Sequence, residues 1–456
     1  MAKSGTHAKS MSRILLWPIF VLLLTMPGSG TPSQTAQTNL FNDAPAHEAD
    51  RLYSCLFIRR AADGSEFGLE ALDPLFWRST QYLITGESHP QALACLDRFL
   101  KARVQEDLSP RERAILQRDL WYLFDWSTQD TDFAPQRQEL QLKLAAVLRQ
   151  LAMSEERVRK LPDNYAAAVA SGRYPRQFDP QQPARSFLPP DLFQPTGPWV
   201  CIAAKPAAPT HLREFFGQSR FLVFINLPNG RAETFDYLHR LYTSGEPARQ
   251  VMEPPPSDAQ FPQFPAGTKV ALVRQMTLFD RDGRLIPTPI TESVQIRVYR
   301  SVAAMPTAGN SADDSSNRAQ EVFDFRLDKQ KFMVGEDSGL VAASPEDKAF
   351  SPFFRSHGVD PFEGPERGNQ GLGESTLVLG SCRVCHSGRG IYSVQSRNRL
   401  LPPNALQRDP ENGRPEYGAR YWETESSLQW KRERYDWGLL NGFWQAAEAA
   451  SHPARR

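Results

Sequence analysis

The sequence predicts an α+β protein with a helical N-terminal domain, a central mixed α/β domain that contains an antiparallel hairpin, and an irregular C-terminal segment. Apolar residues recur at three- and four-residue spacing in the first part of the chain, as they do on amphipathic helices. After a proline-rich stretch the pattern changes to alternating strands, two of which are separated by an Asp–Gly turn. At 456 residues the chain is long enough for two or three domains.

Residues 1–30 have the pattern of a secretory signal peptide, and residues 31–45 are expected to form a flexible mature N-terminus. Three basic residues precede the apolar run 14–26, and small residues follow it. This run is shorter than the roughly 20 apolar residues that a membrane span needs, although an uncleaved N-terminal anchor is the alternative. We therefore expect an exported protein, periplasmic or extracellular, with no stable membrane span after signal cleavage.

Residues 46–173 are predicted to form the helical domain. Ser109 and Glu112 form a capping box with Pro110 at the first helical position, which predicts a helix start. A second helix is expected to begin near Pro135, and a third to run from about Tyr165 to Gly172. Their apolar positions form stripes that indicate core packing: Ile115, Leu116, Leu120, Leu123, Phe124, Leu140, Leu144, Val147, Leu148 and Leu151.

Residues 174–198 contain many prolines and are expected to form an extended strap between domains, because proline disrupts a regular helix. The α+β domain is predicted over residues 199–345. Within it, the strand 270–279 enters the turn signal 280–283 and is expected to form a hairpin. Residues 303–319 are rich in small and polar side chains and are expected to form a disordered surface loop.

Charge and cysteine content narrow the function classes. The chain has 53 Lys and Arg against 52 Asp and Glu, which argues against a nucleic-acid-binding protein. Of the five cysteines, Cys55 and Cys95 lie in helix-like surroundings. They either pair as a disulfide, which an oxidising compartment permits, or are small buried apolar residues. Cys201 lies in an apolar, strand-like run and is expected in the core.

The C-terminal segment 346–456 contains the most specific motif of the chain, Cys382-Arg-Val-Cys385-His386. Two thiols at this spacing can add to the two vinyl groups of one haem, and the adjacent histidine can then ligate the iron. The five residues resemble the covalent attachment site of c-type cytochromes. The resemblance implies one covalent haem c on Cys382 and Cys385, with His386 as the proximal iron ligand.

Two other chemistries compete with haem at this motif. A structural zinc site requires four ligands, and no second Cys pair exists in the chain. A redox disulfide between Cys382 and Cys385 is chemically feasible, but the glycines that follow are a poor start for the helix such a motif normally opens. The export signal supports the haem interpretation, since covalent attachment takes place outside the bacterial inner membrane.

The resemblance does not extend to a small cytochrome c domain, because no methionine follows His386. The distal iron ligand is therefore expected from upstream, at Met333 or His357, or from His452 near the C-terminus; otherwise the sixth iron position is open. Three tryptophans spaced by seven residues, Trp430, Trp437 and Trp444, could wall the haem or belong to an ordinary core.

Three functions follow from these expectations. The first is an exported monohaem c-type protein that transfers electrons to a redox partner protein. The second is a haem enzyme or sensor that binds a small-molecule ligand at an open iron position. The third is a non-haem extracytoplasmic binding or scaffold protein with a Cys382–Cys385 disulfide. Whether the protein is an enzyme is left open by the sequence.

Overall fold

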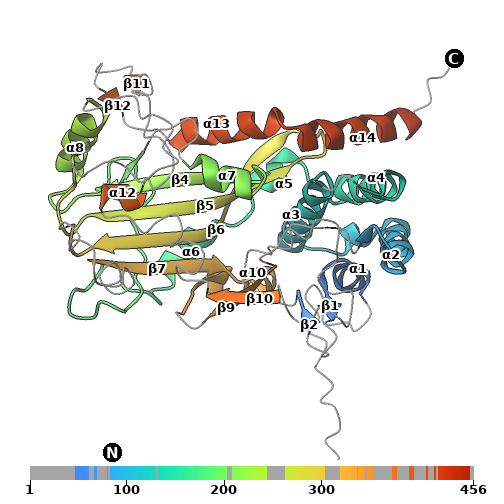
Figure 1. Ribbon diagram of the computed structural model, residues 1–456, viewed down its shortest axis with the longest axis horizontal. Helices are drawn as coiled ribbons and strands as arrows, with labels where there is room; N and C mark the ends of the chain where they lie inside the picture. Colours follow the sequence, from blue (N-terminus) through green and yellow to red (C-terminus); the bar gives the residue numbers. More distant parts are fainter. Residues whose placement is uncertain are drawn as a thin grey trace, which may run out of the picture. The chain divides into compact units, whose positions relative to one another are not determined.

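The structure is a computed structural model and confirms the α+β class: helices precede a six-stranded antiparallel sheet in the chain (Figure 1). The residues that it describes are 47–60, 66–68, 80, 83–129, 132–202, 208–243, 262–302, 319–335, 337–344, 347–352, 372–376, 390–394, 407–408, 415–416 and 420–451. The predicted signal peptide 1–30, the mature N-terminus 31–45 and nearly all of the predicted loop 303–319 lie outside these residues. No helix among the described residues is long and apolar enough to cross a membrane.

The predicted helical region 46–173 contains six α-helices among the described residues, and those that begin at Pro110, Ala134 and Asn164 correspond to the three that the sequence predicted. The six helices are α1 (Glu48–Phe57), α2 (Ser88–Ala102), α3 (Pro110–Ser127), α4 (Ala134–Leu151), α5 (Glu155–Arg159) and α6 (Asn164–Ala170), with a 3-10 turn η2 (Val104–Glu106). The predicted capping box is present at α3, where Ser109 accepts from the Glu112 backbone N–H and the Glu112 carboxylate accepts from the Ser109 N–H. The strap 174–198 contains neither helix nor strand.

The sheet is an antiparallel meander in which each strand pairs with the next along the chain. Its strands are β3 (Val200–Cys201), β4 (Ser219–Asn226), β5 (Lys269–Phe279), β6 (Leu285–Tyr299), β7 (Gln320–Leu327) and β8 (Leu340–Ala342). Three short helices accompany them: α7 (Pro209–Glu214), α8 (Arg231–Thr243) and α10 (Lys329–Val334), with a 3-10 turn η3 (Asp337–Gly339). The predicted hairpin is confirmed, since β5 and β6 pair in antiparallel register around the turn after Phe279.

The C-terminal part of the chain has shorter pieces of structure and two long helices. The pieces are the strand pairs β9 (Lys348–Pro352) with β10 (Leu372–Thr376) and β11 (Gln407–Arg408) with β12 (Pro415–Glu416), and the helix α12 (Ile391–Val394). The long helices are α13 (Arg420–Arg432) and α14 (Tyr435–Ser451). A further strand pair, β1 (Arg59–Arg60) with β2 (Glu66–Phe67), follows α1.

The β5–β6 hairpin carries an irregularity that lets it serve two cores. The register shifts between Gln275 and Thr277, where β6 carries Pro287 and Pro289. A proline lacks the N–H that a ladder requires, so regular pairing is interrupted at this point. Between the register shift and the turn, apolar residues such as Phe279 join the helical core. On the other side of the shift, residues such as Val294 join the core of the sheet.

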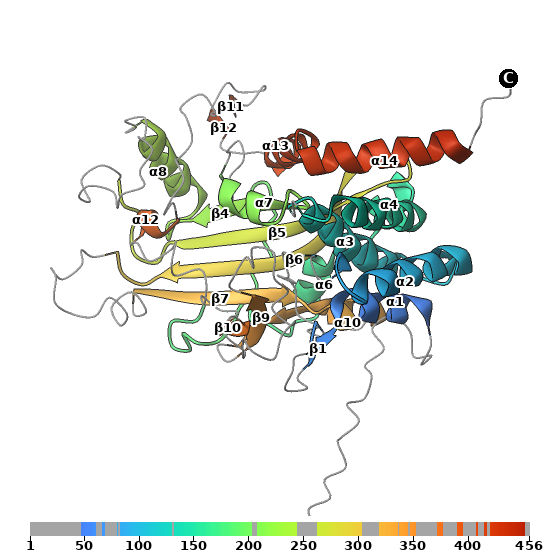
Figure 2. The ribbon, with the colours of Figure 1, turned by 45° about the vertical axis from the view of Figure 1, so that its right-hand side comes forward.

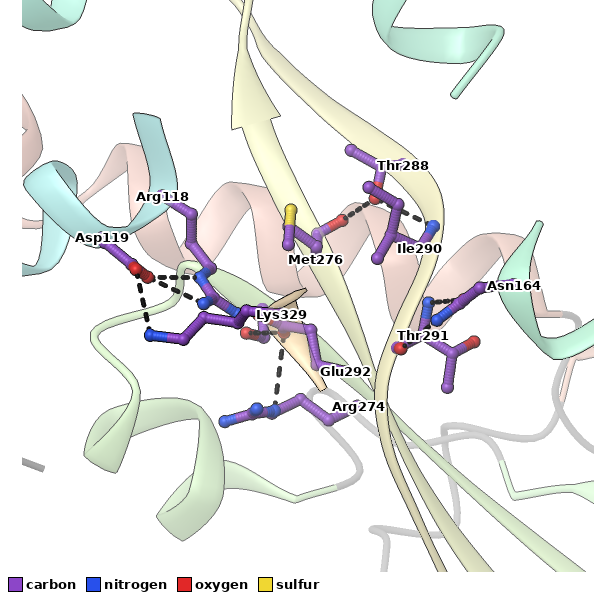
Figure 3. Close-up of polar contacts among 11 residues, drawn as sticks. Arg118, Asp119, Asn164, Arg274, Met276, Thr288, Ile290, Thr291, Glu292 and Lys329 are labelled. Atoms are coloured by element: carbon purple, nitrogen blue, oxygen red, sulfur yellow. Dashed lines mark hydrogen bonds and ion pairs between the residues drawn. The ribbon is translucent and has the colours of Figure 1, made fainter. Parts of the chain in front are cut away.

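Side chains replace the hydrogen bonds that the irregular segment loses (Figure 3). Thr288 donates its hydroxyl to the Met276 carbonyl at 2.8 Å. Asn164, at the start of α6, accepts from the Thr291 N–H at 2.7 Å and donates to the Thr291 carbonyl at 2.9 Å. The amide of Asn164 therefore pairs with β6 as a neighbouring strand would, and joins the helical segment to the hairpin.

One hydrophobic cluster includes side chains of α1 to α4, the tip of the hairpin and α14. Trp121 of α3 lies edge-on to Phe279 at 5.1 Å between ring centroids, and Phe279 in turn contacts Trp444 at 5.2 Å. Helix α14 contacts both α3 and α4 (Figure 1). The helices of 46–173 and the hairpin of 199–345 thus share one core.

Candidate functional site

The residues of the predicted haem site lie outside the described part of the chain. This applies to Cys382, Cys385 and His386, and also to His357 and His452. The described backbone nearest to the motif is Thr376, at the end of β10, on one side and Gly390, before α12, on the other. The structure therefore limits the location of the motif only through Thr376 and Gly390, the described residues on either side of it.

Helix α12, which begins five residues after His386, is fixed to one end of the sheet. Ile391 is 2% exposed and shares a hydrophobic cluster with Tyr237, Phe264 and Tyr299. Its backbone N–H donates to the Gln263 side chain at 3.0 Å, and the Ser393 and Tyr299 hydroxyls are 2.6 Å apart. Figure 2 shows α12 close to α8 at this end of the sheet. The chain that leaves the motif is anchored here.

Met333, the upstream candidate for the distal iron ligand, is a core residue in the structure. It lies in α10, is 8% exposed, and belongs to the hydrophobic cluster of the helices. Helix α10 follows the Leu327 end of β7, whereas Tyr299 pairs with Gln320 at the other end of that strand. Strand β7 has 8 residues, so its ends are about 24 Å apart at about 3.4 Å per residue.

The C-terminal tryptophans also have packing roles. Trp437 and Trp444 are 6% and 5% exposed and belong to the helical core. Trp430 packs against the small cluster around Phe221 and lies under the guanidinium of Arg434, 4.7 Å from the ring centroid. Of the two interpretations of this aromatic stripe, the contacts of Trp437 and Trp444 are those of an ordinary core.

The most unusual feature of the described residues is a group of buried charges next to the irregular segment of the hairpin (Figure 3). We call it the hairpin cluster, and it consists of Arg118, Asp119, Arg274, Glu292 and Lys329. All five side chains are at most 2% exposed. They come from α3, β5, β6 and α10, so the cluster joins four elements of the fold.

Arg118 is the centre of the hairpin cluster. It donates to Asp119 at 2.7 Å and to Glu292 at 3.0 Å. Glu292 also accepts from the Ser219 hydroxyl and lies 3.5 Å from the Nε of Arg274. The Arg274 guanidinium stacks over the Phe215 ring at 4.3 Å. With Lys329, the hairpin cluster holds three cations and two carboxylates, all of them buried.

Lys329 completes the hairpin cluster from α10. Its ammonium is 3.4 Å from Asp119 and donates to the Tyr53 hydroxyl at 2.9 Å. Burial alone would lower the pKa of Lys329, but Asp119 and Tyr53 together outweigh burial and raise this pKa above its ordinary value. Lys329 is therefore a buried ammonium at neutral pH, and it links α10 to α1 and α3.

A second group of buried charges, the C-terminal cluster, consists of Asp125, Lys431, Arg434 and Asp436. Lys431 donates to Asp125 at 2.6 Å and to Asp436 at 2.8 Å, and all three side chains are at most 1% exposed. Arg434 also binds Asp436, at 2.7 Å from its Nε. Burial raises the pKa of Asp125 to about 7; Asp436 adds to the rise, while Lys431 opposes it. This cluster fixes α13 and α14 to α3.

Both clusters were missed in the sequence because their partners are far apart in the chain. Arg118 and Glu292 are 174 positions apart, and Asp125 and Lys431 are 306 apart. One local signal exists. Helix α3 has apolar residues on every side, so charged residues in its middle, such as Arg118, have no exposed face to occupy.

Neither cluster has the composition of a catalytic or metal site. No group of three or more His, Cys, Asp or Glu that could hold a metal ion occurs among the described residues. A cleft of about 470 Å³ lies outside both clusters and is lined by Glu155, Gly283, Arg284, Leu285, Ile286, Arg432 and Trp437. The buried charges join distant elements of the fold to one another.

The chain was compared with known protein families, with curated proteins and with solved structures. No family model, curated protein or solved structure matches it. The function therefore has to be argued from the residues of this chain alone.

Proposed function

We propose that the protein is an exported monohaem c-type protein that transfers electrons. The observation that carries the proposal is the sequence Cys382-x-x-Cys385-His386, combined with an N-terminal export pattern. Cys382 and Cys385 each add across one vinyl group of the haem to form a thioether, and the imidazole of His386 ligates the iron. The bound haem supplies the one-electron chemistry, and a redox partner protein docks at the haem edge.

The anchored helix α12 limits where the haem can lie. Gly390 is four positions after His386, so the two lie at most about 14 Å apart even in a fully extended chain. Gly390 adjoins the apolar cluster of Ile391, Tyr237 and Phe264 at the α8 end of the sheet. A haem needs apolar surroundings, because burial tunes its reduction potential. We therefore place the haem at this end of the sheet.

The position of Met333 helps to choose among the candidates for the distal iron ligand. Met333 is packed in the helical core, beyond the end of β7 that lies farthest from Tyr299 and α12. This geometry favours His357, or an open sixth position, over Met333 as the partner of His386. An open position supports the second candidate function, a haem enzyme or sensor that binds a small ligand such as peroxide, oxygen or nitric oxide.

Covalent haem is the first expected result. The wild-type protein, expressed with a c-type maturation system, should retain haem stain on a denaturing gel and give the pyridine-haemochrome spectrum of a haem c. The double variant Cys382→Ser/Cys385→Ser should lose both, because no thiol is left to form a thioether. Cys201→Ala, which removes a buried thiol in β3, is the matched control and should keep the haem. A wild-type protein without covalent haem would exclude the proposal and leave the scaffold with a Cys382–Cys385 disulfide.

The distal ligand gives a second expected result. Met333→Leu conserves core volume and should cost less than about 1.5 kcal/mol in stability, and it should leave the spectrum of the reduced protein unchanged. If His357 binds the iron, His357→Ala should change that spectrum. If the sixth position is open, His357→Ala should leave the spectrum unchanged, and the wild-type protein should bind carbon monoxide readily. A new spectrum in Met333→Leu alone would show that the placement derived from β7 is wrong.

A further inference from the structure

We propose that Cys55 and Cys95 form a reversible disulfide that joins α1 to α2, with Cys95 as the attacking thiolate and Cys55 as the resolving thiol. The two cysteines are 40 positions apart, and the helices that carry them pack against each other. In the structure both are free thiols, and the Cys55 sulfur lies 3.5 Å from the carbonyl oxygen of Gln91, one turn before Cys95 on α2. This site is independent of the proposed haem.

The surroundings of the two sulfurs differ in a way that assigns their roles. The Nη2 of Arg98, one turn along α2, donates to the Cys95 sulfur at 3.1 Å. The Cys55 thiol lies instead 3.5 Å from the carbonyl oxygen of Gln91, which is a hydrogen-bond acceptor. A guanidinium stabilises a thiolate, and a carbonyl stabilises a protonated thiol. The negative charge therefore belongs on Cys95 and the proton on Cys55.

The direction of the pKa shifts agrees with these contacts. The neighbouring Cys55 thiol and the Arg98 guanidinium together lower the pKa of Cys95 to about 7, against the effect of burial. The neighbouring Cys95, together with burial, raises the pKa of Cys55. Near neutral pH a substantial fraction of Cys95 is thus thiolate, which is the form that attacks a disulfide.

The position of the pair allows a reagent to reach it. Cys55 is only half-buried, and the Arg98 side chain beside Cys95 is 54% exposed. Cys95 itself is 7% exposed, close to the 8% of Cys201, so what distinguishes the pair is the half-buried Cys55 and the exposed guanidinium beside Cys95. A thiol in an electropositive, partly exposed place can exchange with a disulfide in solution.

The oxidant is a disulfide, either of a small molecule or of a partner protein. The Cys95 thiolate attacks one sulfur of the oxidant, the S–S bond of the oxidant breaks, and one thiolate leaves. Cys55 then gives up its proton to solvent and attacks the Cys95 sulfur of the mixed disulfide, which releases the second thiolate. The cysteine pair loses two electrons, and the oxidant is reduced to two thiols.

Closure would change the stability of the helical core. The disulfide would cross-link Cys55 to Cys95 and so restrict the unfolded chain between them. Leu56 of α1 and Leu96 of α2, the next residues along each helix, are fully buried in the shared core. The thermal midpoint of the oxidised protein should therefore exceed that of the reduced protein. The redox state of the surroundings would then set the stability of the helical core.

The full-length protein can be equilibrated with mixtures of reduced and oxidised glutathione, alkylated, and mapped by peptide mass spectrometry. Mapping distinguishes the Cys55–Cys95 bond from any reaction at Cys382 or Cys385. We expect a cross-linked Cys55–Cys95 peptide in oxidised glutathione that disappears on reduction, and a rise of several degrees in the thermal midpoint. The variant Cys55→Ser should stop at a glutathione adduct on Cys95.

Arg98→Met tests the assigned role of the guanidinium. Its reaction with oxidised glutathione should be about three- to tenfold slower than that of wild type at pH 7, because a smaller fraction of Cys95 is thiolate, and the difference should disappear near pH 9.5. Arg103→Met removes an exposed guanidinium that pairs with Glu106, and should react like wild type. Absence of the cross-link in wild type, or an unchanged pH profile in Arg98→Met, would overturn the proposal.

Discussion

Glu292→Gln is expected to destabilise the protein by about 3–5 kcal/mol, because it removes one partner of a buried ion pair and leaves the other charge uncompensated. Glu292 is fully buried and faces Arg118 and Arg274. In the variant, Asp119 alone would balance the three cations of the hairpin cluster. The measurement is the free energy of unfolding from urea denaturation at pH 7.

The matched control is Glu321→Gln, which makes the same chemical change in an exposed pair. Glu321 lies 2.8 Å from Arg300, and the two side chains are 25% and 52% exposed. Pairs of this kind contribute between zero and about 1 kcal/mol. If Glu292→Gln cost no more than this control, the hairpin cluster would not be the desolvated junction that its burial indicates.

The hairpin shows which part of the fold the sequence could predict. An Asp–Gly turn and alternating apolar residues are local signals, so the pairing of β5 with β6 was predicted correctly. The shift in register near Gln275 was not predicted, although Pro287 and Pro289 in β6 are a local sign of it. What this shift achieves, the insertion of the hairpin tip among the helices, depends on contacts that no local pattern contains.

The apolar stripes of the helices also predicted burial correctly but not the packing partners of the buried residues. Ile115, Leu120 and Leu123 were assigned to a core by their spacing, and all three are fully buried. Spacing could not show that this core also includes Phe279 of the hairpin and Trp444 of α14. The partners of a buried side chain depend on how distant segments meet, and only the three-dimensional structure gives that information.

The two candidate sites also differ in how much of each the sequence could predict. The haem motif was recognised in the sequence because Cys382, Cys385 and His386 lie within five consecutive positions, and it stays a prediction. For Cys55 and Cys95 the sequence left pairing and simple burial open. The structure packs α1 on α2, places Cys55 one turn from Cys95 at the Gln91 carbonyl, and adds the guanidinium of Arg98 at the Cys95 sulfur.

Lys431→Met is expected to cost about 3–5 kcal/mol near pH 8, because it leaves Asp125 and Asp436 buried without the cation between them. The loss should shrink as the pH falls to about 5. Lys431 opposes the rise in the pKa of Asp125, so without it burial raises this pKa above the wild-type value of about 7 and far above the unfolded value near 4. Between the two folded-state values the variant binds a proton that folded wild type has released. Stability then rises as pH falls.

The control for Lys431→Met is Lys160→Met, made in a pair with Glu156 whose side chains are 74% and 75% exposed. This variant should stay within about 0.5 kcal/mol of wild type at every pH. Urea unfolding of both variants and wild type at pH 5, 6, 7 and 8 separates the contribution of the C-terminal cluster from general acid effects. A loss in Lys431→Met that is the same at pH 5 and pH 8 would mean that Asp125 stays ionised without Lys431, and that solvent reaches its carboxylate in the variant.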